Sequence, residues 1–281
     1  MRDVAPGDAI YRRDGELYLP TEWAGGPWSP LHQHGGAAAA LLARGALEAS
    51  RETGLRVARL TIDLFRPVPM EPLRLVRRFA RQGRRIALAD LALLHGDQEV
   101  TRASALLLRE REDLAPTWTA GADATPPGPE ACERVEFMPQ AYRKHVPPGF
   151  HWTLEVAIAT TGEAPLAWIR TPLDVVGGEP TSAFERAVGV SDLCFGLGAR
   201  VLLRRRVQDA DLMRTRFIND DTTLYFEREP EGDWFALWPT QVADDRGVGL
   251  AEVVSYDRRG RYGRALQAIL ANEGGGPPIK A

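Results

Sequence analysis

The sequence predicts an α+β protein built from two tandem modules, each a curved antiparallel sheet wrapped around one helix. Three observations predict this fold: a repeat at a fixed offset, a run of strand-like segments in each half, and one helix-forming segment ahead of each run. A Pro- and Gly-rich stretch between Ala115 and Ala131 separates the halves and is typical of a linker. We therefore expect a first module over residues 1–115, a linker over 116–145, a second module over 146–272 and a flexible tail over 273–281.

The repeat aligns the two halves at an offset of 162 residues without a gap. Thr61 falls on Thr223 and Arg66 on Arg228. Further on, Leu88-Ala89-Asp90 falls on Leu250-Ala251-Glu252, and the register holds for nearly 50 positions. Identities kept at strand-like spacing in one register indicate a duplicated module.

Alternating polarity predicts the strands of the first module. Leu60, Ile62 and Leu64 alternate with polar residues, which is typical of a strand with one buried face. Further strands are predicted over Leu73–Ala80, Arg85–Leu94 and Val100–Arg109, with a hairpin turn at His95-Gly96-Asp97 and its counterpart at Tyr256–Gly260.

One helix is predicted ahead of each run of strands. Gly35-Gly36 opens an Ala- and Leu-rich segment over Ala37–Ser50, and a second helix is expected over about Ser182–Leu197. The small alanine side chains suit a buried position, because they let a sheet close tightly around the helix.

Composition and charge narrow the function classes. The formal net charge is −3, from 35 basic and 38 acidic groups, which argues against a nucleic-acid or membrane-surface partner. The two cysteines fit neither a zinc pattern nor a disulfide framework. The most apolar stretch, Ala37–Ala43, is far shorter than the roughly 20 residues of a membrane span. We expect a cytoplasmic protein, with a homo-oligomer such as a dimer left open.

Three segments resemble a known family. His34–Arg44 resembles the helix start of bacterial thioesterase-like proteins with the hotdog fold. Asn219–Pro230 and Gly263–Leu270 resemble segments of acyl-CoA thioesterase II. The resemblance covers nearly the whole chain outside the linker and tail. It implies a double hotdog fold and an acyl-CoA thioesterase that uses neither a metal nor an organic cofactor.

The resemblance also implies site residues in the second module. In the family an Asp, a Thr and a Gln orient the hydrolytic water, and the Asp matches Asp221 while the Gln matches Gln267. The Thr position falls on Gln241, one residue after Thr240. A shift of one residue turns a strand side chain to the other face. Either a bulge restores Thr240, or Gln241 takes over, or the site is weakened.

Both matched residues also have ordinary structural interpretations. Asp221 shares a predicted strand face with Thr223 and Tyr225, and a carboxylate there is equally typical of a solvated strand or a partner for an Arg. Asp220 is expected to face the other way. Gln267 falls on Ala105 of the first module, in an otherwise apolar strand, where an amide with satisfied hydrogen bonds is the alternative to a catalytic role.

The helix start is the expected oxyanion site. The N–H groups of Gly35 and Gly36, at the positive end of the helix dipole, can stabilise charge on a thioester carbonyl oxygen. We expect His34 to line the substrate pocket, whereas a metal site at His32 and His34 lacks nearby carboxylate or Cys ligands. The alternative is a plain helix start with glycines for packing.

Two functions remain open. The first is hydrolysis of a fatty or related acyl-CoA by water that Asp221 activates. The second is non-catalytic binding of acyl-CoA or lipid by a double hotdog with a degenerate site. The arginine run from Arg74 to Arg85 is either a partner for coenzyme A phosphates or a solvated strand face. A hydratase is not expected, because neither predicted helix carries an Asp and a His about five residues apart.

Overall fold

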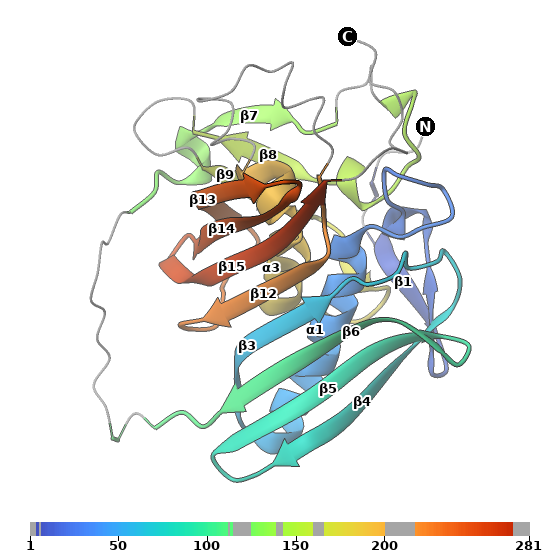
Figure 1. The fold of residues 1–281 in the computed structure, drawn as a ribbon, viewed down its shortest axis with the longest axis vertical. Helices are drawn as coiled ribbons and strands as arrows, with labels where there is room; N and C mark the ends of the chain where they lie inside the picture. Colours follow the sequence, from blue (N-terminus) through green and yellow to red (C-terminus); the bar gives the residue numbers. More distant parts are fainter. Residues whose placement is uncertain are drawn as a thin grey trace.

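One curved sheet and two helices form the fold in this computed structural model, which describes residues 4–5, 7–111, 113–114, 125–138, 143–159, 166–199 and 217–271. Figure 1 shows the sheet curving in front of both helices. The helices are α1 (Gly35–Thr53) and α3 (Ala183–Ser191). The strands are β1 (Ala9–Asp14), β2 (Leu17–Pro20), β3 (Arg56–Asp63), β4 (Leu73–Gln82), β5 (Ile86–His95), β6 (Gln98–Leu108), β7 (Glu133–Glu136), β8 (Glu155–Ile158), β9 (Ala167–Arg170), β10 (Asp174–Val176), β11 (Phe217–Asn219), β12 (Asp221–Phe226), β13 (Phe235–Asp245), β14 (Val248–Asp257) and β15 (Gly260–Ala271).

The two modules share one sheet, which joins them through the parallel pair of β1 with β10 and through the antiparallel pair of β3 with β12, called the module seam below. Its strand order is β10-β1-β2-β4-β5-β6-β3-β12-β15-β14-β13-β9-β8-β7, with β11 also pairing with β15. At the seam β3 pairs antiparallel with β12, and Thr61 lies opposite Thr223. The predicted α+β architecture of two joined modules is confirmed.

The repeat extends to the pairing inside each module. Ser104 lies opposite Thr61 in the first module, and Leu266, its counterpart at the offset of 162, lies opposite Thr223 in the second. Likewise Ala89 lies opposite Ala105, and Ala251 lies opposite Gln267. The offset therefore relates residues that occupy equivalent places in the two sheets.

Small residues allow α1 to sit between the sheet and α3. Every residue from Gly36 to Gly45 is buried. A Cβ atom added to Gly36 would lie 2.6 Å from the carbonyl oxygen of Gly189 on α3, so the two helix backbones touch there. Gly54, in the left-handed conformation with φ 64°, ends α1.

Helix α3 is shorter than the sequence predicts. A capping box between Ser182 and Glu185 begins it, and regular α-helix ends at Ser191. The chain continues as a π-helical turn over Cys194–Ala199. The propensities that favour a helix to Leu197 do not reveal this change in hydrogen bonding, which is common at functional sites.

The segment between the modules takes part in the sheet. Residues 115–124 and 139–142, which carry much of the predicted linker, lie outside the described residues. Within the same stretch, β7 pairs antiparallel with β8 at one end of the sheet. None of the helices in the described part of the chain is long and apolar enough to cross a membrane.

Candidate active site

The helices run antiparallel, so the N-terminus of α1 meets the C-terminus of α3. Gly36 contacts Gly189 at this junction. At the N-terminus of α3, Oε1 of Glu185 in the first turn lies 2.9 Å from Nε of Arg44, which is in the middle of α1. The start of each helix thus packs against the other helix, which gives the fold two pseudo-equivalent junctions.

Asp192 lies at the centre of the first junction. It directly follows α3 and is 7% exposed. Its Oδ1 accepts a hydrogen bond from Nδ2 of Asn219 at 2.8 Å, and its Oδ2 lies 3.1 Å from Nδ1 of His34. Each carboxylate oxygen therefore has a side-chain nitrogen atom close by.

The Asp192 carboxylate also faces the first turn of α1. A Cβ atom added to Gly35 would lie 2.6 Å from Oδ1 of Asp192, so glycine is required for this approach. His34 caps the helix, because its Nδ1 accepts a hydrogen bond from the N–H of Gly36 at 3.0 Å. The positive end of the α1 dipole stabilises negative charge at this position.

Gln267 joins the same junction from β15. Its side chain is fully buried, and its Oε1 accepts a hydrogen bond from the N–H of Phe195 at 2.8 Å. Its Nε2 donates to the carbonyl oxygen of Asp192 at 3.0 Å and to Oγ1 of Thr222 at 2.8 Å. Both hydrogens of the amide are thus engaged, and Gln267 fixes the turn that carries Asp192.

The other predicted carboxylate, Asp221, lies on the outer face of the sheet. Its half-buried side chain accepts a hydrogen bond from the N–H of Ala268 at 2.6 Å, and it lies opposite Asp63 across the module seam. Burial raises the pKa of Asp221, with a smaller contribution from Asp63. The next residue along β12, Thr222, is the one that reaches Gln267. His34, Gly35, Gly36 and Gln267 therefore gather around Asp192 and not around Asp221.

Thr240 and Gln241 lie apart from this junction. The register of β13 shifts between Pro239 and Gln241, which is the bulge that the sequence left open. Thr240 is nevertheless exposed, and its Oγ1 donates to the carbonyl oxygen of Glu252 at 3.4 Å. Gln241 is exposed as well. Strand β14 separates both residues from the strand of Gln267.

Sequence reasoning missed Asp192 and Asn219. Asp192 falls inside the predicted second helix, among apolar residues such as Val190, Leu193 and Phe195. A lone carboxylate in an apolar run is unusual, because burying a charge is costly unless it is paired. That was the available signal. Asn219 offered a weaker one, since it begins the segment that carries the family resemblance.

The second junction has different chemistry at the equivalent positions. Arg44 and Asp192 occupy equivalent sequence positions, because each follows the first residue of its helix, Gly35 or Ala183, by the same number of residues. The counterpart of Gln267 is Ala105. A cavity of about 340 Å³ beside this junction is lined by Arg44, Leu47, Arg51, Gly178, Glu179, Pro180 and Glu185. Arg44 pairs with both glutamates, so this end carries ion pairs where the first carries a carboxylate.

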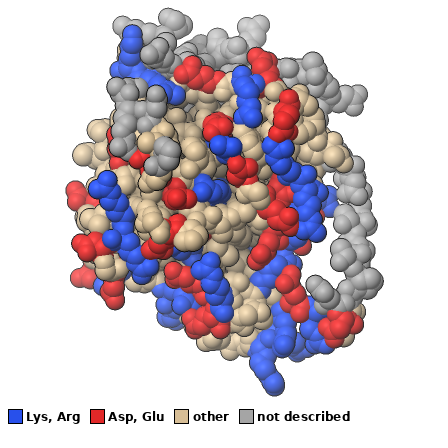
Figure 2. Space-filling view, turned by 180° about the vertical axis from the view of Figure 1, so that it is seen from behind, with Lys and Arg blue, Asp and Glu red and all other residues tan. Residues whose placement is uncertain are grey.

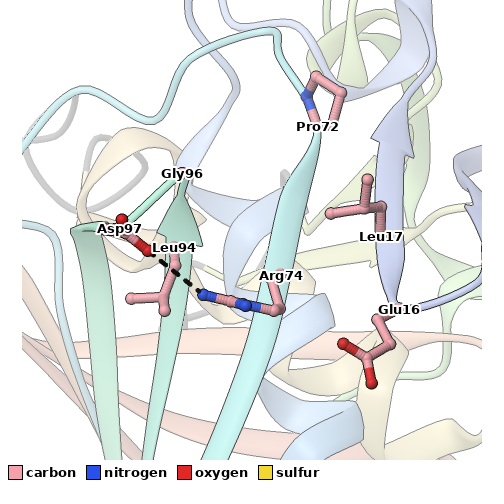
Figure 3. A pocket seen from close by; sticks show the side chains of 7 residues that line it. All are labelled: Glu16, Leu17, Pro72, Arg74, Leu94, Gly96 and Asp97. Atoms are coloured by element: carbon pink, nitrogen blue, oxygen red, sulfur yellow. Dashed lines mark ion pairs between the residues drawn. The ribbon is translucent and has the colours of Figure 1, made fainter.

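Half of the arginines in the run from Arg74 to Arg85 pair with carboxylates. Arg77 pairs with Glu52 at 2.7 Å and Arg78 with Asp90 at 2.8 Å. Arg74 lies 3.8 Å from Asp97, and both line a cavity of about 300 Å³ (Figure 3). The other lining residues come from the β1–β2 turn, the start of β2, the residue before β4 and the β5–β6 hairpin. Figure 2 shows basic and acidic side chains interspersed over the face it presents. These contacts favour a solvated strand face over a dedicated phosphate site.

A metal has no evident site in the part of the chain that the structure describes. No group of three or more His, Cys, Asp and Glu side chains there has an arrangement that could hold an ion. His32 forms an isolated bridge with Pro69, so its backbone belongs to the loop that leads into α1.

Solved structures share this fold over nearly their whole length. A thioesterase-like structure from Novosphingobium aromaticivorans has 20% sequence identity and a TM-score of 0.65, covering 96% of this chain and 100% of that one. An acyl-CoA thioesterase II from Mycobacterium marinum has 13% identity and a TM-score of 0.62, with 96% of each chain covered. A hotdog-fold protein from Alicyclobacillus acidocaldarius has 15% identity and a TM-score of 0.62, covering 96% and 99%. At these identities the likeness shows the double hotdog fold alone.

Comparison with protein-family sequence patterns identifies the family of the chain, which the structural likeness does not. A comparison with curated protein sequences gives no match. Residues 24–108 match the sequence pattern of the acyl-CoA thioesterase N-terminal domain. Residues 111–270 match that of the acyl-CoA thioesterase C-terminal domain. Because the two matches together span most of the sequence, in the order of the two modules, the chain belongs to the acyl-CoA thioesterase family.

Proposed function

We propose that the protein hydrolyses the thioester of an acyl-CoA, with Asp192 as the general base. The observation that carries the proposal is the Asp192 carboxylate, which Asn219 and His34 hold against the N-terminus of α1. A base and a set of backbone N–H donors thus lie side by side, which is what attack on a carbonyl carbon needs. Family membership supports acyl-CoA as the substrate.

The chemistry follows from these positions. Asp192 takes a proton from water as the water oxygen bonds to the thioester carbon. The carbonyl π electrons move to the oxygen, and the N–H groups at the start of α1 stabilise the resulting oxyanion. When the carbonyl reforms, the carbon–sulfur bond breaks and coenzyme A leaves as a thiolate, which takes up the proton held by Asp192. The products are a carboxylic acid, which ionises in water, and a free thiol.

Gln267 acts in this proposal as a positioning residue. Both of its amide hydrogens are engaged with protein oxygens, one of them the carbonyl oxygen of Asp192. It therefore acts through the turn that carries Asp192, and Asn219 fixes the carboxylate itself. The sequence analysis expected Thr240 or Gln241 to assist the catalytic carboxylate. In this proposal Asn219 has that role.

The experiment compares two isosteric variants, Asp192→Asn and Asp221→Asn. Free-thiol release should be measured over a panel of acyl-CoA chain lengths. Asp192→Asn should lower kcat by about 10²–10⁴-fold, because the amide cannot accept a proton from water. Asp221→Asn should keep nearly full activity, because its side chain lies on the outer face and keeps its acceptor for Ala268. The opposite ranking would restore Asp221 as the base.

A non-catalytic binding protein is the second candidate. It is favoured by the burial of the junction, since Asp192 is 7% exposed and Gln267 fully buried. Calorimetric binding of a non-hydrolysable acyl-CoA thioether, together with no thiol release from any substrate in the panel, would establish this function instead.

A further inference from the structure

Nδ1 of His34 has two neighbours that make opposite demands on it. It lies 3.0 Å from the backbone nitrogen of Gly36, which carries a hydrogen and needs an acceptor. It also lies 3.1 Å from Oδ2 of Asp192, which as a carboxylate oxygen needs a donor. One ring nitrogen has a single position in the ring plane for either a proton or a lone pair. It can therefore satisfy one neighbour at a time.

The packing around His34 restricts rotation of its ring, so Nδ1 stays near both neighbours. His34 is nearly buried, and its ring stacks on that of His151 with centroids 6.0 Å apart and planes at 20°. Phe150 packs on another side at 5.2 Å. Burial, followed by the nearby His34, lowers the pKa of His151 to about 3, so His151 is neutral near pH 7. The stack therefore holds the ring of His34 in place, and His151 adds no positive charge beside it.

We propose that His34 is a positioning residue that couples the ionised carboxylate of Asp192 to release of the Gly36 N–H as an oxyanion donor. With Asp192 ionised, the imidazole takes the tautomer that has its proton on Nδ1 and donates it to Oδ2. The N–H of Gly36 then loses its cap and is free for the thioester oxygen. When Asp192 is protonated before substrate binds, Nδ1 is bare and caps Gly36; during turnover the oxyanion already holds the Gly36 N–H when Asp192 takes up its proton. The base and the oxyanion donor thus become available together.

The inference rests on the proposed function, since it concerns the same carboxylate, but its first test needs no turnover. The ¹H–¹⁵N spectrum of ring-labelled histidines distinguishes a protonated from a bare Nδ1, and His34→Asn identifies the His34 signal by its loss. In the full chain at neutral pH, Nδ1 should be protonated, and it should become bare in Asp192→Asn. A bare Nδ1 in the unmodified chain, or no change in Asp192→Asn, would overturn the inference even if the enzyme hydrolyses acyl-CoA.

Kinetics of His34→Asn supply the second test. Asparagine is a good N-cap, so its side-chain oxygen should hold the Gly36 N–H permanently while its amide donates to Asp192. Melting temperature and affinity for an acyl-CoA thioether should stay unchanged, whereas kcat should fall about 10²–10³-fold, as when one oxyanion donor is lost. A purely structural cap predicts unchanged kcat, and that result would overturn the inference. Absence of hydrolysis by the unmodified chain would instead contradict the proposed function.

Discussion

Thr61 and Thr223 hydrogen-bond to each other through their side chains, with 3.3 Å between the two Oγ1 atoms, across the seam between the modules. Each is the counterpart of the other in the internal repeat, and they lie in register on β3 and β12. A residue that contacts its own counterpart must lie on the axis that relates two halves. The local two-fold axis of the fold therefore passes between these threonines, and the departures from symmetry mark what the second module has gained.

Gln267, whose counterpart in the first module is Ala105, is one such departure from symmetry, and we predict its effect on stability. Gln267→Ala should lower the free energy of unfolding by at least about 2 kcal/mol, because the buried polar groups of Asp192, Phe195 and Thr222 lose their partner. Urea denaturation at constant pH measures the change. The matched control is Gln241→Ala, an exposed amide on β13 that should leave stability within about 0.5 kcal/mol of the starting value. Equal effects of the two changes would contradict this role of Gln267.

Asp257 should be a second stabilising departure from symmetry. Its side chain is fully buried and binds Arg228 through two hydrogen bonds of 2.6 and 2.7 Å. Asp257→Ala should cost about 3–5 kcal/mol, because it leaves a largely buried charge without its partner. Thermal and urea denaturation measure the loss. Asp245→Ala, on an exposed turn at the other end of β14, is the control and should have little effect.

Gln267 and its neighbours also show which parts of the fold and of the site can be predicted from the sequence. Alternation and the fixed offset predict the strands that follow each helix and the outward direction of Asp221, because both depend on a period of two. They do not reveal β1, β2 or β7–β10. The position of Asp192 depends instead on where α3 gives way to the π-helical turn. A buried hydrogen bond from Gln267, distant in sequence, stabilises that turn, and helix propensity carries no information on it. Gly35, Gly36 and Gln267 were site candidates from the sequence, whereas for Asp192 the sequence offered only a lone carboxylate in an apolar run and not its place beside them.

Asp221 allows a prediction of pH dependence. Burial raises its pKa in the folded state, so the folded protein favours the protonated form more than the unfolded chain does. Its ionisation therefore destabilises the fold as pH rises from the ordinary aspartate range through the raised value. Asp221→Asn should be more stable than the unmodified chain at neutral pH, and the difference should vanish in acid. Melting temperatures measured as a function of pH test this, and a constant difference at all pH values would contradict it.

Gly35→Ala tests the proposed site through the backbone. The added Cβ would meet Oδ1 of Asp192 at 2.6 Å, so the carboxylate must move away from the start of α1. Alanine is at least as good a helix former as glycine, so the fold should survive and the substitution should act mainly on turnover. We expect kcat to fall at least about tenfold while the melting temperature changes little, because small displacements of a catalytic group are costly.

Gly45→Ala is the matched control within α1. There the new Cβ lies 3.2 Å from the flexible side-chain ends of Leu75 and Leu91, away from the carboxylate, and activity should be kept. If both alanines are equally active, the carboxylate at the N-terminus of α1 does not take part in hydrolysis, because only one of the two substitutions displaces it.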